Sequence, residues 1–225
     1  ARAMASHTGS VAGQDSLYEA LINQAGIIRV HEYEDLLLGA KAFMSQPLPG
    51  GNRLGIISLT GAMGIQWIDA AGEHGLVLGE PTKDSMERLL SIHPTLGSHP
   101  VDLGPASAAN GADLFTFYMK SYDVLMNDDN IDCIYLNTYI SSYFAPDVYE
   151  GLFQYMVDNL RKPVVAWSYG PSSDAVRKLG ALTEQCGIPF YPTTRKAIEA
   201  LGYLVKYARW RTINPEHGIV DPAVQ

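Results

Sequence analysis

Hydrophobic residues recur in two alternating patterns along most of this chain. From Arg53 onward, short runs of consecutive apolar residues are followed by longer segments in which apolar positions repeat every three or four residues. The short runs indicate buried strands, and the longer segments indicate amphipathic helices. Strands are expected at 54–59, 76–78, 131–137, 164–168 and 189–191. Helices are expected at 63–74, 82–90, 112–126, 147–160, 173–186 and 195–210.

This alternation predicts an α/β fold with a parallel sheet. Right-handed crossovers between successive strands favour the strand order 2-1-3-4-5, which is a flavodoxin-like five-stranded parallel sheet. Residues 94–110 are rich in Pro, Gly and Ser and are expected to form an irregular connection. Ligands of such sheets bind beyond the carboxyl ends of the strands, near the point where the strand order reverses. The loops after the first, third and fourth strands are therefore the expected place for a site.

The first 46 residues follow a different pattern. They predict a helix at 14–24, one strand at 27–30 and a helix at 33–43. One strand cannot bury the apolar faces of both helices, so these faces need an outside partner or an upstream half. The apolar residues concerned are Leu17, Leu21, Ile22, Leu36, Leu37 and Phe43. The expected division is a C-terminal fragment of another domain (1–46), a linker (47–52), the flavodoxin-like domain (53–211) and a tail or linker (212–225).

Charge and composition exclude several classes of protein. The net charge is −8 and no block of lysine or arginine occurs, which argues against nucleic acid or an anionic membrane surface as a partner. No apolar run reaches the length of a membrane span and no signal-peptide pattern is present, so a cytoplasmic location is expected. Cys133 and Cys186 lie outside any metal-ligand spacing, so we expect neither a disulfide nor a metal site. Cys133 is expected to face the sheet interior.

The loop Ser58–Gly64, after the first strand, offers backbone groups that could bind phosphate. Gly61 and Gly64 allow the chain to turn sharply and to approach a ligand closely. The helix that follows would present unpaired N–H groups and the positive end of its dipole to the same place. Short glycine-bearing turns between a strand and a helix are also common as plain connections. The loop alone leaves both interpretations open.

His7 is the candidate nucleophile. It lies in a short Ser, Thr and Gly stretch before a predicted helix, and an ordinary histidine pKa of about 6.5 keeps most of the imidazole neutral and nucleophilic at pH 7. A histidine near a terminus is also commonly just exposed to solvent. Asp102 could either cap nearby amides or orient a ligand, and the capping role is favoured. Aromatic residues gather after the third and fourth strands, where some could contact a ligand and half or more could pack against a partner domain. They are Tyr139, Tyr143, Phe144, Trp167 and Tyr169.

These motifs resemble those of the NDP-forming acyl-CoA synthetases, which are relatives of succinyl-CoA synthetase, over about residues 1–211. In that family a stretch like Ser6-His7-Thr8-Gly9-Ser10-Val11-Ala12-Gly13 carries a transiently phosphorylated histidine, and a run like Gln24–Val30 is also typical. Ser58–Gly64 resembles the loop whose following helix faces the phosphohistidine. The run His99–Leu103 resembles a family Asn-Pro-Val-Asp-Leu sequence in which His99 replaces the usual Asn. Ala62 and Met63 stand where many relatives are richer in glycine.

The resemblance implies an acid–thiol ligase that interconverts acyl-CoA, phosphate and ADP with acid, CoA and ATP through a phosphohistidine. His7 would be the catalytic residue. The phosphate-binding residues would be Gly9, Ser10, Thr60, Gly61, Ala62, Met63 and Gly64. No cofactor would be bound permanently, because CoA, ATP or ADP, and phosphate are substrates. Residues 1–46 would complete a CoA-ligase domain, and the enzyme, an oligomer acting on a small organic acid, would also need a CoA-binding domain and an ATP-grasp domain or subunit that carries Mg²⁺.

Two alternatives from other classes stay open at this point. Ser58-Leu59-Thr60-Gly61-Ala62 resembles the phosphate loop of flavodoxins, which would make the chain an FMN-binding or nucleotide-binding module. Met63 stands where flavodoxins usually have a threonine, and this alternative leaves residues 1–46 unexplained. A non-catalytic scaffold with the same fold is the other alternative, and the intact stretch Ser6–Gly13 counts against it.

Overall fold

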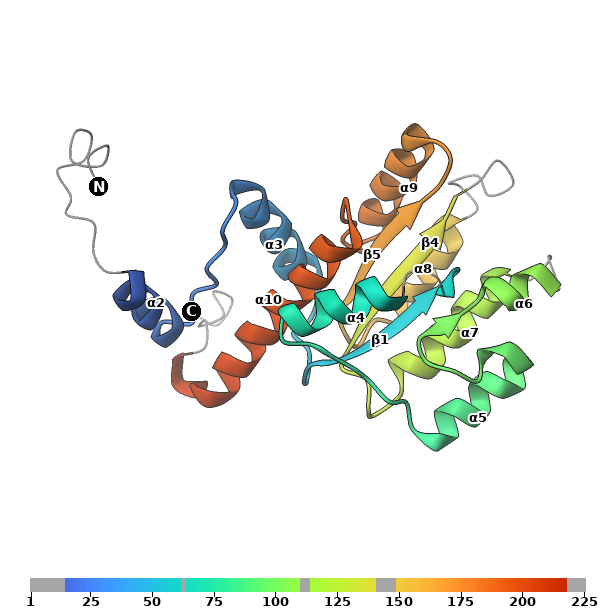
Figure 1. The fold of residues 1–225 in the computed structure, drawn as a ribbon, viewed down its shortest axis with the longest axis horizontal. Helices are drawn as coiled ribbons and strands as arrows, with labels where there is room; N and C mark the ends of the chain where they lie inside the picture. The colour runs from blue at the N-terminus through green and yellow to red at the C-terminus, as the bar shows by residue number, and fades with distance from the viewer. Residues whose placement is uncertain (1–14, 62–63, 110–113, 141–148, 218–225) are drawn as a thin grey trace.

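A parallel sheet forms the centre of the computed structural model, which describes residues 15–61, 64–109, 114–140 and 149–217 (Figure 1). The strand order is β2-β1-β4-β5, and β3 also pairs with β1. The strands are β1 (Arg53–Ser58), β2 (Val77–Leu78), β3 (Val101–Asp102), β4 (Cys133–Tyr139) and β5 (Val164–Tyr169). The α/β class, the five-stranded parallel sheet and the order of the first four predicted strands are thus confirmed.

The sheet differs from the prediction at both of its edges. The predicted fifth strand, 189–191, makes a single parallel bridge between Phe190 and Ala166. Pro189 has no N–H to donate, which limits the ladder at this edge. The fifth strand is instead β3, inside the connection that the sequence predicts as irregular. Val101 and Leu103 are both fully buried with the half-buried Asp102 between them, so the alternation of a strand is present but too short to stand out.

One edge of β1 is shared by two short strands. β2 pairs with the first two residues of β1, and β3 pairs with the last two. Between them the backbone N–H of Ile56 donates to Nε2 of His99 at 2.9 Å. The imidazole therefore fills the gap in the ladder, because a buried N–H without a partner would cost free energy. No pattern in the sequence predicts this role of His99.

Acidification is expected to destabilise the protein through His99. Burial lowers its pKa from 6.5 to about 4, and contact with the Gly79 backbone offsets only part of this shift. Between pH 6.5 and about pH 4, the His99 imidazole is therefore mostly protonated in the unfolded chain and mostly neutral in the folded chain. Stability should fall as the pH falls from 6.5 toward 4, by up to about 3 kcal/mol. Chemical denaturation at pH 7 and at pH 4.5 measures this loss.

His99→Asn is the matched control for this effect, because its side chain can also accept from the Ile56 N–H and does not titrate. Asp128 and Asp132 also have lowered pKa values, so protonation of these two carboxylates will destabilise both the native protein and the variant in acid. The difference between the two pH profiles isolates His99. Identical profiles for the variant and the native protein would contradict this account of the edge.

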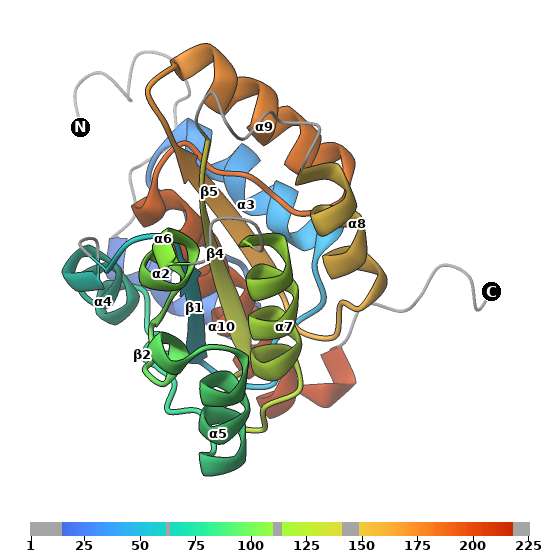
Figure 2. The same ribbon diagram turned by 90° about the vertical axis from the view of Figure 1, so that its right-hand side faces the viewer.

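Helices cover both faces of the sheet (Figures 1 and 2). The first face packs against α5 (Lys83–Ile92), α6 (Gly104–Ala109), α7 (Leu114–Met126), α8 (Glu150–Asp158) and α9 (Ser173–Gln185). The second face packs against α3 (Tyr33–Ser45), α4 (Gly64–Glu73) and α10 (Thr194–Ile213). The remaining elements are α2 (Asp15–Gln24), η2 (Pro94–Leu96) and η4 (Pro215–His217).

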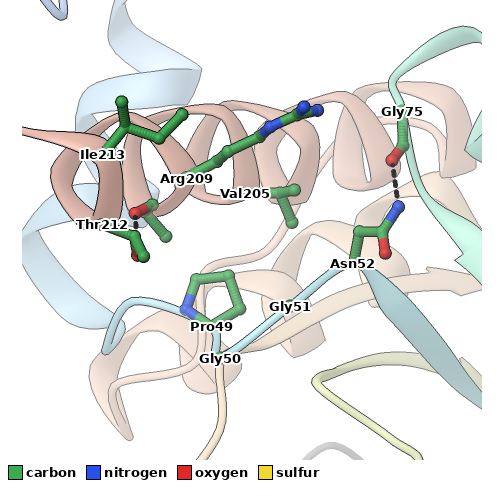
Figure 3. Close-up of a pocket in the computed structure, with 10 residues that line it drawn as sticks. Pro49, Gly50, Gly51, Asn52, Gly75, Val205, Arg209, Thr212 and Ile213 are labelled. Carbon is green, nitrogen blue, oxygen red and sulfur yellow. Dashed lines mark hydrogen bonds between the residues drawn. The ribbon is translucent and has the colours of Figure 1, made fainter.

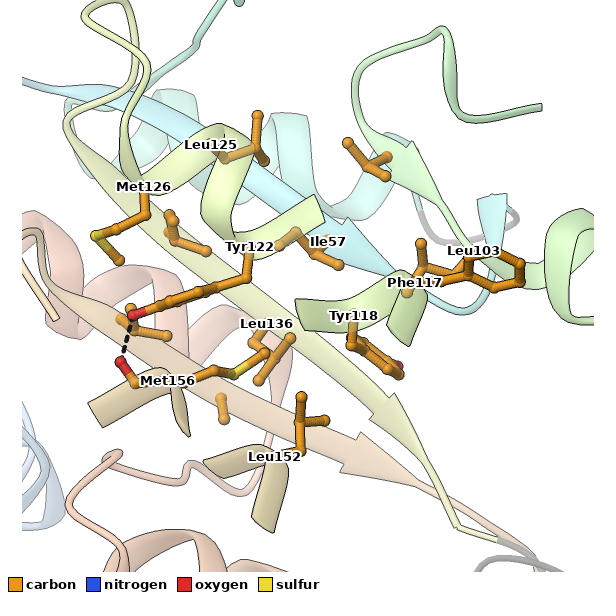
Figure 4. Close-up of a cluster of buried hydrophobic side chains, with 14 of the residues drawn as sticks. Ile57, Leu103, Phe117, Tyr118, Tyr122, Leu125, Met126, Leu136, Leu152 and Met156 are labelled. Atoms are coloured by element: carbon orange, nitrogen blue, oxygen red, sulfur yellow. Dashed lines mark hydrogen bonds between the residues drawn. The ribbon is translucent and has the colours of Figure 1, made fainter. Parts of the chain in front are cut away.

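The core on the first face contains two tyrosines of α7 that are fully buried (Figure 4). The Tyr122 hydroxyl donates to the Met156 carbonyl at 2.6 Å, and the Tyr118 hydroxyl donates to the Asn137 carbonyl at 2.9 Å. Each buried hydroxyl is thus satisfied, and each bond joins α7 to a neighbouring element. On the second face, Cys133 is fully buried as predicted, and burial raises the pKa of its thiol.

The amino-terminal segment forms both predicted helices, α2 and α3. Residues 27–30 form no strand in the structure, so that prediction is wrong; a strand needs a paired neighbour, and the described residues provide none there. Apolar side chains on both helices are exposed as predicted, with Leu37 at 60% and Leu17 at 59%. Ala42, on the other side of α3, is fully buried in the core of the second face.

Residue 46 joins this segment firmly to the sheet. The Gln46 side chain accepts from the Val164 N–H at 2.7 Å and donates to the Gly187 carbonyl at 2.9 Å. The division into residues 1–46, 47–52, 53–211 and 212–225 stays a prediction. None of the helices in the described ranges is both long and apolar enough to cross a membrane.

Candidate functional site

The carboxyl ends of β1, β4 and β5 lie at the same edge of the sheet (Figure 1). Ser58 ends β1, and its hydroxyl accepts from the Thr60 N–H at 3.0 Å. The same hydroxyl lies 2.9 Å from Asn137 Oδ1, to which it can donate. Ser58 and Asn137 are buried, so these bonds fix the start of the predicted phosphate loop to the neighbouring strand.

Asp102 holds the other side of this loop. Its Oδ1 accepts the Gly104 N–H at 2.9 Å, which is the local capping role that the sequence predicts for it. The next residue, Leu103, donates its N–H to the Ser58 carbonyl at 2.7 Å. The turn between β3 and α6 is therefore hydrogen-bonded to the end of β1.

Two glycines make this close contact possible. A Cβ atom on Gly61 would lie 2.9 Å from Asp102 Oδ2, and a Cβ atom on Gly104 would lie 2.8 Å from the Leu59 carbonyl oxygen. Neither glycine has a positive φ. The predicted reason for Gly61 was a sharp turn and close approach to a ligand, whereas the structure shows close approach to Asp102. The sequence does not reveal this contact, because the two residues are distant in the chain.

The Asp102 carboxylate also places a negative charge beside the loop. Like charges repel more strongly where solvent is excluded. If the loop binds phosphate, its amides and the dipole of α4 must outweigh this charge. No lysine or arginine occurs between residues 58 and 64, so the loop itself supplies no cationic side chain.

Three aromatic side chains at the carboxyl ends of β4 and β5 pack against one another. The rings of Trp167 and Tyr169 are stacked with centroids 5.7 Å apart, and those of Tyr139 and Tyr169 are tilted with centroids 4.9 Å apart. Burial raises the pKa of Tyr169, and a hydrogen bond with the Thr60 side chain opposes that rise. All three rings are half-buried, and Tyr169 is the one that is linked to the loop, through Thr60.

The structure describes only part of the predicted site. Thr60, Gly61 and the helical backbone of Gly64 lie at the carboxyl edge, where the sequence predicts them. The other predicted site residues lie outside the described residues, and they are His7, Gly9, Ser10, Ala62 and Met63. Contact between the His7 imidazole and the backbone amides of residues 61–64 stays a prediction.

Comparison with known sequences finds several CoA ligases. The family described as "Succinyl-CoA ligase like flavodoxin domain" matches residues 1–43. Acetate–CoA ligase [ADP-forming] II of Archaeoglobus fulgidus is 34% identical over 216 residues, which cover 93% of this chain and 31% of that protein. The alpha subunit of acetate–CoA ligase [ADP-forming] II of Pyrococcus furiosus is 32% identical, with 92% of this chain and 45% of the subunit covered. The chain thus spans about a third to a half of the length of these relatives.

Among solved structures, the chain is similar to the dinucleotide-forming acetyl-coenzyme A synthetase 1 of Ca. Korarchaeum cryptofilum in complex with phosphate and ADP. The TM-score is 0.77 at 26% identity, and the match covers 98% of this chain and 47% of that one. The likeness therefore includes the amino-terminal segment as well as the sheet.

Proposed function

Since the chain belongs to the NDP-forming acyl-CoA synthetase family, we propose that it is part of an enzyme that interconverts acyl-CoA, phosphate and ADP with acid, CoA and ATP. The observation that carries this proposal is the 34% identity to an ADP-forming acetate–CoA ligase over 93% of the chain. The relatives named above are ligases, so the flavin-binding alternative is not favoured. We place the enzyme in the cytoplasm.

His7 is the phosphoryl carrier in this proposal. A ring nitrogen of His7 attacks the phosphorus of an acyl phosphate, the bond from phosphorus to the acyl oxygen breaks, and the carboxylate leaves. A terminal oxygen of ADP then attacks the same phosphorus, and the bond from nitrogen to phosphorus breaks to give ATP. Both steps conserve the phosphoryl group and need no oxidant or reductant.

The loop after β1 would hold the phosphohistidine by its backbone. The bonds of Ser58 and the contact of Asp102 with Gly61 support this role, because they immobilise the loop before any ligand arrives. Amides that are already oriented stabilise a negative charge without reorganising. The amides of Gly61, Ala62, Met63 and Gly64, together with Gly9, Ser10 and Thr60, would provide this cradle.

The proposed partners are a CoA-binding domain, the rest of a CoA-ligase domain, and an ATP-grasp domain or subunit, in an oligomer that acts on a small organic acid. The chain covers 31% and 45% of its two relatives, which leaves room for these parts. The exposed apolar faces of α2 and α3 also support a partner there. As the family resemblance implies, we assign Mg²⁺ to the ATP-grasp partner.

Reconstitution tests the proposal. The complete enzyme, produced with the products of neighbouring genes, is expected to cleave ATP to ADP and phosphate only when CoA and a suitable organic acid are both present. Formation of acyl-CoA in step with ADP would support the proposal. ATP cleavage that is independent of CoA, or no cleavage with a panel of short acids, would contradict it.

A further inference from the structure

A cavity of about 410 Å³ lies between the loop that precedes β1 and the C-terminal half of α10 (Figure 3). Residues 49–52 form one wall, and Val205, Arg209 and Ile213 lie on the other. The cavity is at the amino end of β1, whereas the predicted phosphate loop begins at the carboxyl end. Six residues of strand separate the two places by roughly 20 Å. The cavity is therefore separate from the candidate site described above.

Three cations lie near the end of α10, and only Lys206 among them has an electrostatic effect on a described acidic residue, Glu19. Lys206, Arg209 and Arg211 make no hydrogen bond or ion pair with any residue that the structure describes. Earlier in the same helix, Arg195 pairs with Glu73, and Lys196 pairs with Asp35. The chain has a net charge of −8, so acidic residues outnumber basic ones and could have paired with these cations. The free cations are thus a local feature of this end of the helix.

Arg209 contributes to two neighbouring cavities. It lines the one above and also a cavity of about 270 Å³ on the side that faces residues 23–28, where Lys206 is a second cation. In Figure 3 its side chain extends along the cavity toward Asn52 and Gly75. A guanidinium group has several N–H donors in a planar fork that matches a carboxylate or a phosphate.

The opposite wall is a loop that is hydrogen-bonded to a neighbouring turn. The N–H groups of Gly50 and Gly51 form no hydrogen bond within the described chain. Asn52 donates from Nδ2 to the Gly75 carbonyl at 2.8 Å, which ties this loop to the turn after α4. This wall of the cavity is therefore held in place, and Arg209 supplies N–H donors from the opposite wall.

The rest of the lining includes apolar side chains, one of which is largely exposed to solvent. Val205 and Ala208 present aliphatic surface, and Ile213 at the rim is 67% exposed. Small-molecule sites combine such apolar walls with a few polar groups, in cavities of about 300–1,000 Å³. A ligand that carries an oxyanion and a short apolar body matches both parts of the lining.

We propose that this cavity binds a small organic anion, with its carboxylate or phosphate on Arg209 and its apolar body against Val205, Ala208 and Ile213. The site is additional to the proposed catalytic site and does not depend on it. A carboxylate and a phosphate would bind Arg209 through the same kind of hydrogen bonds. Two probes distinguish these ligands: one is a carboxylate that contains no phosphorus, and the other is a phosphate that has no apolar body.

Titration of the protein with butyrate and with inorganic phosphate, followed by calorimetry, tests the proposal. Saturable binding of at least one probe is expected, and Arg209→Gln should weaken that binding at least tenfold. Arg88→Gln removes another exposed cation, on α5, whose side chain pairs with no described residue, and this change should leave the affinity unchanged. Matching circular dichroism spectra show that the variants are folded. Equal affinity in Arg209→Gln, or no saturable binding of either probe, would overturn the proposal.

Discussion

Replacing His7 with alanine is expected to abolish ATP formation from acyl-CoA, phosphate and ADP in the complete synthetase. No other group in the proposed mechanism carries the phosphoryl group from the acyl phosphate to ADP. Loss of a covalent carrier commonly lowers kcat by several orders of magnitude. The assay is the initial rate of ATP formation, together with acid-labile phosphate bound to the protein.

His31→Ala is the matched control for this variant. His31 is also a histidine of the amino-terminal segment, it is exposed, and it has no assigned role. The His31→Ala enzyme should form ATP and incorporate acid-labile phosphate at levels near those of the native enzyme. A His7→Ala enzyme that retains more than about a tenth of the native rate would remove His7 from the mechanism.

Trp67→Ala is expected to give the largest loss of stability among single changes near the site. Trp67 lies on α4, is 1% exposed, and packs its ring 5.9 Å from that of Tyr135 in β4. Truncation of a buried tryptophan costs about 3–5 kcal/mol through lost burial and a residual cavity. Because α4 follows the predicted phosphate loop, the same change should loosen the start of that helix. Denaturant titration measures the free energy of unfolding.

Ile68→Ala provides the comparison on the same helix. Ile68 is 49% exposed, so its truncation should change the free energy of unfolding by no more than about 0.5 kcal/mol. Equal effects of the two substitutions would show that α4 is not anchored through Trp67.

The layers of the fold could be predicted from the sequence because their signals are local. The apolar runs of β1, β4 and β5 and the periodicity of the long helices place these elements within a few residues. The buried position of Cys133 followed from its place within an apolar run. The exposed apolar faces of α2 and α3 were also predictable, because one predicted strand could not cover both helices.

The edges of the sheet could not be predicted in this way. β3 has only two residues, and the neighbouring gap is closed by the His99 side chain instead of a strand. Such a pairing depends on a contact between residues 43 positions apart, which a local pattern does not contain. The same limit applies to the site: the loop could be located, whereas the contact of Asp102 with Gly61 could not.

A crystal structure of the phosphorylated synthetase tests the central claim most directly. The account predicts the phosphoryl group on His7, with its oxygens within hydrogen-bond distance of the backbone N–H groups between Gly61 and Gly64. A phosphohistidine bound against another helix in every state of the catalytic cycle, with these amides remote from it, would contradict the account.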